Sequence, residues 1–232
     1  MRATPRTQGS KTGQVYDRLK SVIVLQKLPP RTPLEMKNIA ESFGVSITPV
    51  REALILLANE GIIAKDSTRS YVTRALNSRE VQNDYEAAFM IARYCVENAI
   101  KPFVATGLRF VDARVPDNPT AQDNAQIVAL AIEALYERLA GLTENERMVR
   151  LMLELKDRTS FVRQLYLQDQ GRLDASISAM TSFIQYVEVG EIEKAIGNLK
   201  KQYQRKYDVI PDLVREGNIY ALEAVDIFNK QG

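Results

Sequence analysis

Three hydrogen-bonding residues, Ser46, Thr48 and Arg51, lie close together at the start of an amphipathic segment. Their positions fall on the exposed side of a helix whose buried stripe would be formed by Val50, Ala53, Leu54 and Leu57. Hydroxyl groups and free backbone N–H groups at a helix N-terminus are suited to contact with phosphate. The spacing therefore predicts a polar, basic helix start that can meet a polyanion.

Residues suited to catalysis are sparse. The chain has no histidine, which is the side chain best suited to proton transfer near neutral pH and the commonest metal ligand. It also has no GxGxxG, GxxxxGK[ST] or GxSxG motif. Carboxylates such as Glu144 and Glu146 are explained by a solvated helix start. An enzyme therefore has little support, and turnover in a broad hydrolase and oxidoreductase screen would be needed to revive that hypothesis.

Two helices are expected before the polar segment. Apolar residues recur at helical spacing from Val15 until Leu28-Pro29-Pro30 ends the first helix. A second short helix opens at Leu34-Glu35 and is closed by Gly44, a typical C-terminal stop. The third helix begins at Ser46 or Thr48, tolerates Pro49 in its first turn, and ends at Glu60-Gly61. Two short helices joined around a glycine predict a helix-turn-helix, whose second helix enters the major groove of DNA.

A β-hairpin is predicted directly after the third helix. Ile62-Ile63 and Tyr71-Val72 have the composition of short strands, and the polar segment from Lys65 to Ser70 would connect them. Such a hairpin is a wing. Lys65 and Arg69 would then be placed to reach the DNA backbone or minor groove.

Charge is distributed unevenly along the 232 residues. Residues 1–80 contain 13 Lys and Arg against 7 Asp and Glu, and the remainder contains 18 against 22, so the net charges are +6 and −4. Clustered Lys and Arg bind phosphates by releasing counterions, which favours nucleic-acid binding by the front of the chain alone. The single cysteine, Cys95, and the lack of a long apolar run or signal peptide predict a cytoplasmic protein with no membrane partner.

The predicted fold is mainly α. Residues 1–12 lack periodicity and are expected to be a flexible arm, residues 13–76 form the winged helix-turn-helix, and residues 80–232 form an all-α bundle of six or seven helices. Helical segments are expected at about 80–105, 121–140, 144–169, 172–188, 191–208 and 211–229. The polar joint Asn77 to Arg79 would separate the two domains.

The turn and third helix carry a family resemblance. The run FGVSITPVREAL, from Phe43 to Leu54, followed by Gly61-Ile62-Ile63, resembles the GntR family of bacterial regulators over about residues 14–75. The resemblance implies DNA-contacting roles for Lys37, Ser46, Thr48, Arg51 and Arg69. Ile47 is also counted in this DNA-binding set, but it stands where the family usually has an arginine. Its β-branched side chain would suit contact with a thymine methyl group.

The second part is similar, more distantly, to the FCD-type ligand-binding domain of the FadR/VanR branch of this family. Arg93-Tyr94-Cys95-Val96-Glu97 resembles the RxxLE pattern, Leu139 with Asn145 fits LxxxxxN, and Val189-Gly190-Glu191 with Ala195 fits the turn before the last long helices. The resemblance implies helices around an effector pocket and a homodimer.

Many members of that branch hold a metal with one Asp and three His. The matching positions, by spacing, are Ile132, Tyr136, Met180 and Gln202. None of these is a usual ligand, so we predict no metal and no cofactor. The same residues would make the pocket floor more apolar, with Tyr136 and Gln202 as hydrogen-bond donors.

The effector-binding set implied by the resemblance is Arg93, Tyr136, Asn145, Met180 and Gln202. Arg93 has two interpretations, because an inward guanidinium needs a carboxylate from either an incoming acid or Glu97 within one turn. The effector would be a small organic acid or an apolar molecule. The sequence does not choose between them.

Together these patterns predict a dimeric transcriptional regulator on a palindromic operator, with repression as the expected sign and a small-molecule effector in the bundle. One alternative keeps the DNA binding and makes the bundle only a dimerisation or protein-interaction module. Another uses the winged helix for protein contact instead of DNA.

Overall fold

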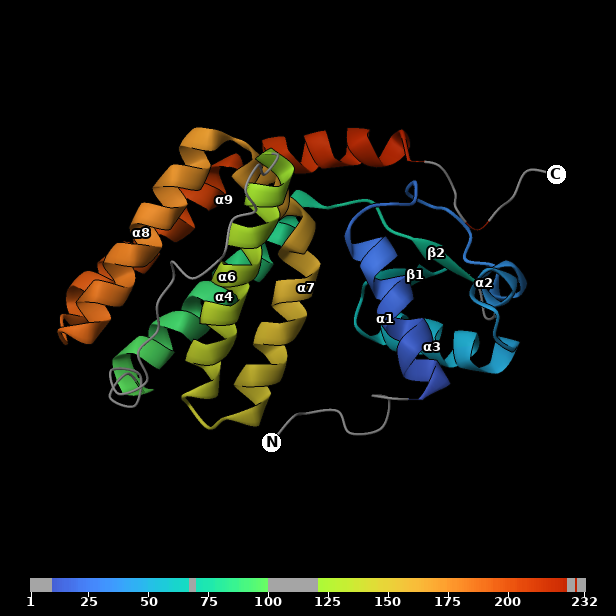
Figure 1. Cartoon of the computed structure of the whole chain (residues 1–232), viewed down its shortest axis with the longest axis horizontal. Helices are drawn as coiled ribbons and strands as arrows, with labels where there is room; N and C mark the ends of the chain where they lie inside the picture. Colours follow the sequence, from blue (N-terminus) through green and yellow to red (C-terminus); the bar gives the residue numbers. More distant parts are fainter. Residues whose placement is uncertain (1–9, 67–69, 100–120, 225–227, 229–232) are drawn as a thin grey trace. The chain divides into compact units, whose positions relative to one another are not determined.

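The computed structural model describes residues 10–66, 70–99, 121–224 and 228 (Figure 1). The chain forms two compact units, residues 1–77 with 215–232 and residues 78–214. The sequence assigned residues 215–232 to the helical domain, so the grouping of this last stretch with the first unit is a finding of the structure. Most of the expected arm lies outside the described residues.

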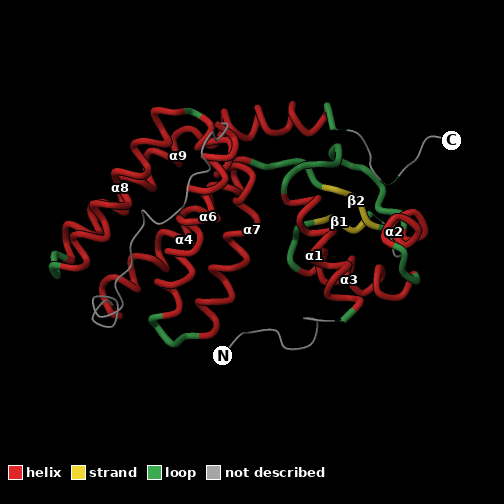
Figure 2. Tube along the Cα trace, in the orientation of Figure 1, coloured by secondary structure: helices red, strands yellow, loops and turns green. Residues whose placement is uncertain are grey.

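Three helices of the first unit pack around one apolar core: α1 (Lys11–Val24), α2 (Met36–Phe43) and α3 (Ile47–Asn59) (Figure 2). The most buried members of this core are Leu19, Ile39, Val50, Ala53, Leu54 and Leu57. Helix α1 begins earlier than Val15, where the first helix was expected. The reason is local, since the Ser10 hydroxyl oxygen caps it by accepting a hydrogen bond from the Gly13 N–H at 3.1 Å.

The turn between α2 and α3 depends on Gly44. Its φ of 65° lies in the left-handed region, which glycine adopts at little cost. The Val45 N–H then donates to the Ala40 carbonyl at 3.0 Å and closes the end of α2. Ser46 occupies the N-cap position of α3, so the chain reverses within a few residues into the expected helix-turn-helix.

The wing is a two-stranded antiparallel sheet of β1 (Ile63–Lys65) and β2 (Tyr71–Thr73). Its register places Ile63 opposite Thr73 and Lys65 opposite Tyr71. Pro33 forms an isolated bridge with Val72, which attaches the segment before α2 to the hairpin. The expected wing is therefore present, and its strand β2 is attached to the segment that precedes α2.

Helix α1 is fastened to α3 by polar contacts as well as by the core. The Tyr16 hydroxyl donates to Glu60 Oε1 at 2.6 Å, and Lys20 Nζ lies 2.9 Å from Glu60 Oε2. Nearer the start of α3, the Thr12 hydroxyl donates to Glu52 Oε2 at 2.6 Å. These bonds fix the rotation of α3 about its axis, and hence which of its side chains face outward.

The second unit is built from helices alone in its described part: α4 (Ser78–Ala99), α6 (Ala121–Gly141), α7 (Glu146–Gln168), α8 (Gln170–Glu188) and the first part of α9 (Ile192–Leu222). Helices α6 and α7 run side by side, and α4 packs against both (Figure 1). Asp84 of α4 forms a two-point ion pair with Arg158 of α7, with Nε to Oδ2 at 3.0 Å.

Helix α9 corrects one expectation. The segments 191–208 and 211–229 were expected to be separate helices broken near Pro211, but one helix runs from Ile192 to Leu222 through that proline. Proline removes the N–H that would bond the carbonyl of Tyr207 four residues earlier. The Gln82 side-chain amide of α4 donates to this carbonyl at 3.5 Å. The neighbouring helix thus satisfies the group that the proline leaves unpaired.

Candidate nucleic-acid interface and buried pocket

The start of α3 presents an exposed polar edge. Ser46, Thr48 and Arg51 are all exposed, and the side chain of Ile47 between them is 44% exposed. Within the described residues, no hydrogen bond or ion pair occupies Ser46, Thr48 or Arg51. Because α3 is packed through its opposite face, these side chains are available to an external partner.

The electrostatics of this edge favour an anion. The first turn of α3 contains no acidic residue, and the Ser46 side chain does not cap the helix. The unpaired N–H groups and the positive end of the helix dipole therefore face outward beside the Arg51 guanidinium. Such an arrangement is suited to phosphate oxygens and to the acceptor groups of base edges.

The other expected DNA-contacting residues lie on α2 and the wing. The Lys37 side chain is 79% exposed, with Nζ 4.0 Å from Glu41 Oε1. This is a surface ion pair of small strength, which DNA phosphates can replace. Lys65 at the end of β1 is exposed, and Arg69 lies outside the described residues.

Replacing Ile47 by arginine is expected to tighten binding to non-specific duplex DNA about five-fold at 0.1 M salt, because one more cation would meet a phosphate. The slope of log affinity against log salt should steepen by about one for each protomer. Fluorescence anisotropy over a salt series measures both. Ile55→Arg is the matched control, since Ile55 lies on the same helix and is 42% exposed. An equal gain from Ile55→Arg would show that net charge alone is responsible.

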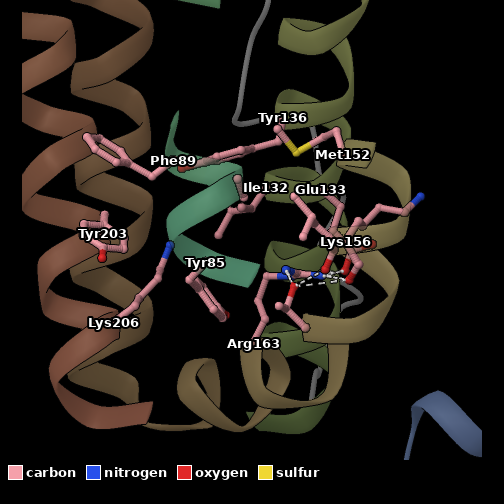
Figure 3. Close-up of a pocket in the computed structure, with 13 residues that line it drawn as sticks. Tyr85, Phe89, Ile132, Glu133, Tyr136, Met152, Lys156, Arg163, Tyr203 and Lys206 are labelled. Atoms are coloured by element: carbon pink, nitrogen blue, oxygen red, sulfur yellow. Dashed lines mark hydrogen bonds and ion pairs between the residues drawn. The ribbon is translucent and has the colours of Figure 1, made fainter. Parts of the chain in front are cut away.

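A pocket lies inside the second unit, between α4, α6, α7 and α9 (Figure 3). The space between its walls is about 560 Å³ when the open solvent at its mouth is included. Aromatic and apolar side chains line most of it, together with a few charged groups. Its aromatic and charged members include Tyr85, Phe89, Glu133, Tyr136, Arg163 and Lys206.

Arg163 is a buried charge with its partners in place. Its Nη2 lies 2.5 Å and its Nε 3.1 Å from Glu133 Oε1, and it also donates to Thr159 Oγ1 at 2.9 Å and to the Lys156 carbonyl at 2.8 Å. The two charged side chains are only 9% and 12% exposed. A buried ion pair with satisfied donors holds α6 and α7 in a defined register, and its charges cancel.

Lys206 is a buried charge with no partner among the residues that the structure describes. The residue is 7% exposed, and no hydrogen bond or ion pair reaches its ammonium group from the described residues. Figure 3 shows the side chain extending from α9 toward α4, with none of the marked interactions ending on it. Burial, and then repulsion from Arg163, lower the pKa of Lys206 to about 8.

Aromatic residues form the rest of the pocket wall. The rings of Phe89 and Tyr203 are stacked, with centroids 4.9 Å apart and 13° between their planes. Burial raises the pKa of Tyr136 to about 12 and also raises that of Tyr85. Both phenols are therefore protonated near neutral pH and can donate hydrogen bonds.

The structure separates the residues that the resemblance grouped as an effector site. Tyr136 lines the pocket, whereas Met180 is fully buried and lies outside its lining. Gln202 is buried and donates to Asn198 Oδ1 at 2.6 Å, with its own Oε1 unpaired among the described atoms. Asn145 is exposed and caps α7 by accepting from the Arg147 and Met148 N–H groups.

Arg93 also lies elsewhere than expected. An inward orientation was expected, with either Glu97 or an incoming acid as its partner, but its side chain is 47% exposed and its Nε lies 2.7 Å from Glu97 Oε1. The i,i+4 ion pair on the helix surface is thus the arrangement present. A side chain of this length is easily solvated on an exposed helix face, so nothing drives it inward.

The residues at the branch's metal positions do not fit a metal. Ile132 and Met180 are buried and offer no oxygen or imidazole ligand, which leaves only a phenol and an amide. Two such weak polar groups cannot hold a divalent cation in water. Within the part of the chain that the structure describes, no three His, Cys, Asp or Glu side chains are clustered.

The charged groups of the pocket were not predicted. The signal for Lys206 was nonetheless present, because it lies on the buried stripe of α9 at helical spacing. The described members of that stripe are Ala195, Leu199, Gln202, Lys206, Ile210 and Leu213. A lysine at such a position is a departure from the pattern that sequence inspection can detect.

No helix of the described chain has an apolar stretch long enough to cross a membrane.

Comparison with known proteins identifies the class. Residues 11–77 match the model of "Bacterial regulatory proteins, gntR family". The Bacillus subtilis transcriptional regulator YdhC is 22% identical over 208 residues, or 88% of this chain and 92% of that protein. The Escherichia coli transcriptional repressor RspR is 37% identical over 70 residues, or 30% of this chain and 31% of that protein.

The fold of the whole chain matches as well. A transcriptional regulator of Rhodococcus sp. RHA1 superimposes with a TM-score of 0.67 at 20% identity, over 87% of this chain and 98% of that one. The protein is therefore a DNA-binding transcriptional regulator and not an enzyme. Its residues 11–77 are similar to the GntR family, and its fold joins an N-terminal helix-turn-helix domain to a C-terminal helical domain.

Proposed function

We propose that the protein is a homodimeric repressor that binds a palindromic operator through the N-terminal edge of α3. The observation that carries this proposal is the exposed row of Ser46, Thr48 and Arg51, which has no side-chain partner among the described residues and lies on a helix packed through its other face. Two such helices in a dimer would dock in successive major grooves, about 34 Å apart. The relative RspR, which is named as a repressor, supports the sign of control. A bacterial regulator of this kind acts in the cytoplasm, where the chromosome lies.

We further propose that a small-molecule effector in the pocket of the second unit modulates DNA affinity, as in the FCD-type domain of the FadR/VanR branch. The pocket has the apolar wall and the few charged groups typical of ligand sites. An effector changes DNA affinity only through unequal affinity for the DNA-competent and DNA-incompetent arrangements. The pocket must therefore be coupled to the winged domain.

Helix α9 supplies a physical connection for this coupling. It carries Tyr203 and Lys206 of the pocket lining, and its residues from Arg215 onward belong to the first unit. There the Asn218 side chain accepts from the Leu76 N–H at 2.9 Å and donates to the Leu76 carbonyl at 3.0 Å. Asn218 thus hydrogen-bonds to both backbone groups of Leu76, near the end of the winged domain.

Asn218→Ala is expected to reduce the effect of an effector on operator affinity several-fold, while the affinity for the effector stays within about two-fold. The reason is that the alanine removes both bonds to Leu76 and leaves the pocket intact. Anisotropy titrations of operator DNA with and without effector measure the coupling. Asn198→Ala is the control, because Asn198 also lies on α9. It tests whether the loss of any asparagine on this helix reduces the effect of the effector on operator affinity.

The test of the proposed function starts from the operator. Duplexes selected from random DNA should be two-fold symmetric, and a reporter with such a site over its promoter should be expressed less when the protein is present. Compounds that raise the melting temperature are then added to the protein–operator complex. We expect at least one to weaken operator binding about ten-fold or more. The effector proposal fails if every stabilising compound leaves operator affinity unchanged, and the repressor proposal fails if reporter expression rises.

A further inference from the structure

We propose that Lys206 is the anion-binding residue of the pocket, and that it takes the carboxylate of a small monoanionic organic acid without a metal ion. This inference rests on the proposed function, because it assigns a ligand class to the effector pocket. The ammonium group of Lys206 would itself supply the positive charge. The positions matched to metal ligands hold residues such as Ile132 and Met180, which do not fit a metal.

The charge balance of the pocket indicates a single negative charge on the ligand. Arg163 is neutralised by Glu133, and Lys156 has Glu137 Oε2 at 3.5 Å from its Nζ. Only Lys206, among the described lining residues, is left without an acidic partner. A buried charge is costly unless it is paired, so the missing counter-ion is the group that the site is built to receive. One unpaired cation matches one carboxylate.

The remaining lining residues indicate the body of the ligand. The stacked rings of Phe89 and Tyr203 and the side chains of Ile132 and Met152 offer an apolar, largely aromatic surface. A planar aromatic or short aliphatic group gains most by contact with such a surface. The Tyr136 phenol is protonated and can donate to an oxygen of the carboxylate. An aromatic or aliphatic monocarboxylate meets these conditions together.

The proposal has a pH dependence. The titratable and charged groups facing Lys206 in the pocket come from every helix that lines it: Tyr85 of α4, Glu133 and Tyr136 of α6, Lys156 and Arg163 of α7, and Tyr203 of α9. The pKa of Lys206 is lowered to about 8, whereas those of Tyr85, Tyr136 and Tyr203 are raised. Lys206 is therefore the lining group whose lowered pKa causes it to lose its charge between pH 7 and 9. Acid binding should be strongest below pH 8 and weaken above it.

The experiment compares acids with neutral molecules of the same shape. Benzoate, phenylacetate and hexanoate, and the corresponding amides, are titrated into the full-length protein at pH 7 by calorimetry, with EDTA present and absent. We expect at least one acid to bind about ten-fold or more tightly than its amide, with no effect of EDTA. Lys206→Met should reduce the affinity for that acid to the level of the amide. Lys201→Met, an exposed lysine on the same helix, should leave it unchanged.

Several outcomes would overturn the assignment. They are equal binding of acid and amide, loss of acid binding in EDTA, an unchanged affinity in Lys206→Met, and no binding by any of the three acids. Far-ultraviolet circular dichroism confirms that each variant is folded before titration. The two proposals fail separately: acid binding that leaves operator affinity unchanged would refute the effector role and keep the Lys206 site. A neutral compound that releases the operator would refute the Lys206 site and keep the effector role.

Discussion

Arg51→Ala is expected to weaken operator binding by at least about 30-fold. A guanidinium that contacts a base or phosphate contributes about 1–3 kcal/mol to each half-site, and a two-fold symmetric complex loses this contribution twice. The variant should fold normally, because Arg51 is exposed and has no partner within the described residues. Anisotropy with a selected operator measures the loss, and circular dichroism and melting temperature establish that the fold is kept.

The matched control is Arg150→Ala. Arg150 is exposed on α7 of the second unit, and its replacement removes the same charge from a part of the chain with no expected role at the DNA. It should change operator affinity by less than about two-fold at 0.15 M salt. Equal losses from the two variants would refute the assignment of the α3 edge as the DNA-binding surface. Equal binding by Arg51→Ala and the unchanged protein would refute it as well.

Lys206→Met is expected to raise the free energy of unfolding of the ligand-free protein by up to about 3 kcal/mol at pH 7. This value is the cost of holding an ammonium whose pKa falls from 10.5 in the unfolded chain to about 8 in the folded protein. Methionine has a similar length and flexibility and carries no charge to desolvate. The melting temperature should rise by several degrees. Urea unfolding measures the free energy directly.

The pH dependence identifies the cause of this gain. Because the unfolded chain binds the proton of Lys206 more tightly, the stability of the unchanged protein rises with pH between about 8 and about 10.5. The advantage of Lys206→Met should thus be constant below pH 8 and shrink by about 1.4 kcal/mol for each pH unit above it. Lys201→Met should show neither effect, since Lys201 is exposed. A destabilised Lys206→Met, or an advantage independent of pH, would mean that the ammonium already has a partner.

The winged domain was predictable because its signals are local. A stripe such as Val50, Ala53, Leu54 and Leu57 reports a helix and its buried face within two turns, and Gly44 reports its own left-handed turn. The start of α1 was missed by four residues, since the cap by Ser10 was not considered. The identity of the exposed edge of α3 followed from the same periodicity.

Pro211 shows where local signals mislead. A proline inside a helical pattern predicts a break, and the sequence carries no local signal to the contrary. The helix continues through Pro211, and the Gln82 amide, more than 100 residues earlier in the chain, lies 3.5 Å from the carbonyl that the proline leaves free. Tertiary packing overrode a local preference. The consequence is functional, because the uninterrupted α9 carries both Lys206 and Asn218.

The sequence alone determined the domain order, the helix-turn-helix and the side chains that α3 exposes, because helix period, capping and turn preferences act over a few residues. Only the tertiary structure decided that Arg163 finds Glu133, that Lys206 finds no acid among the described residues, and that Arg93 stays on the surface. The physical reason is that a buried charge is paired or unpaired according to which distant helices surround it, and that depends on the packing of the whole domain.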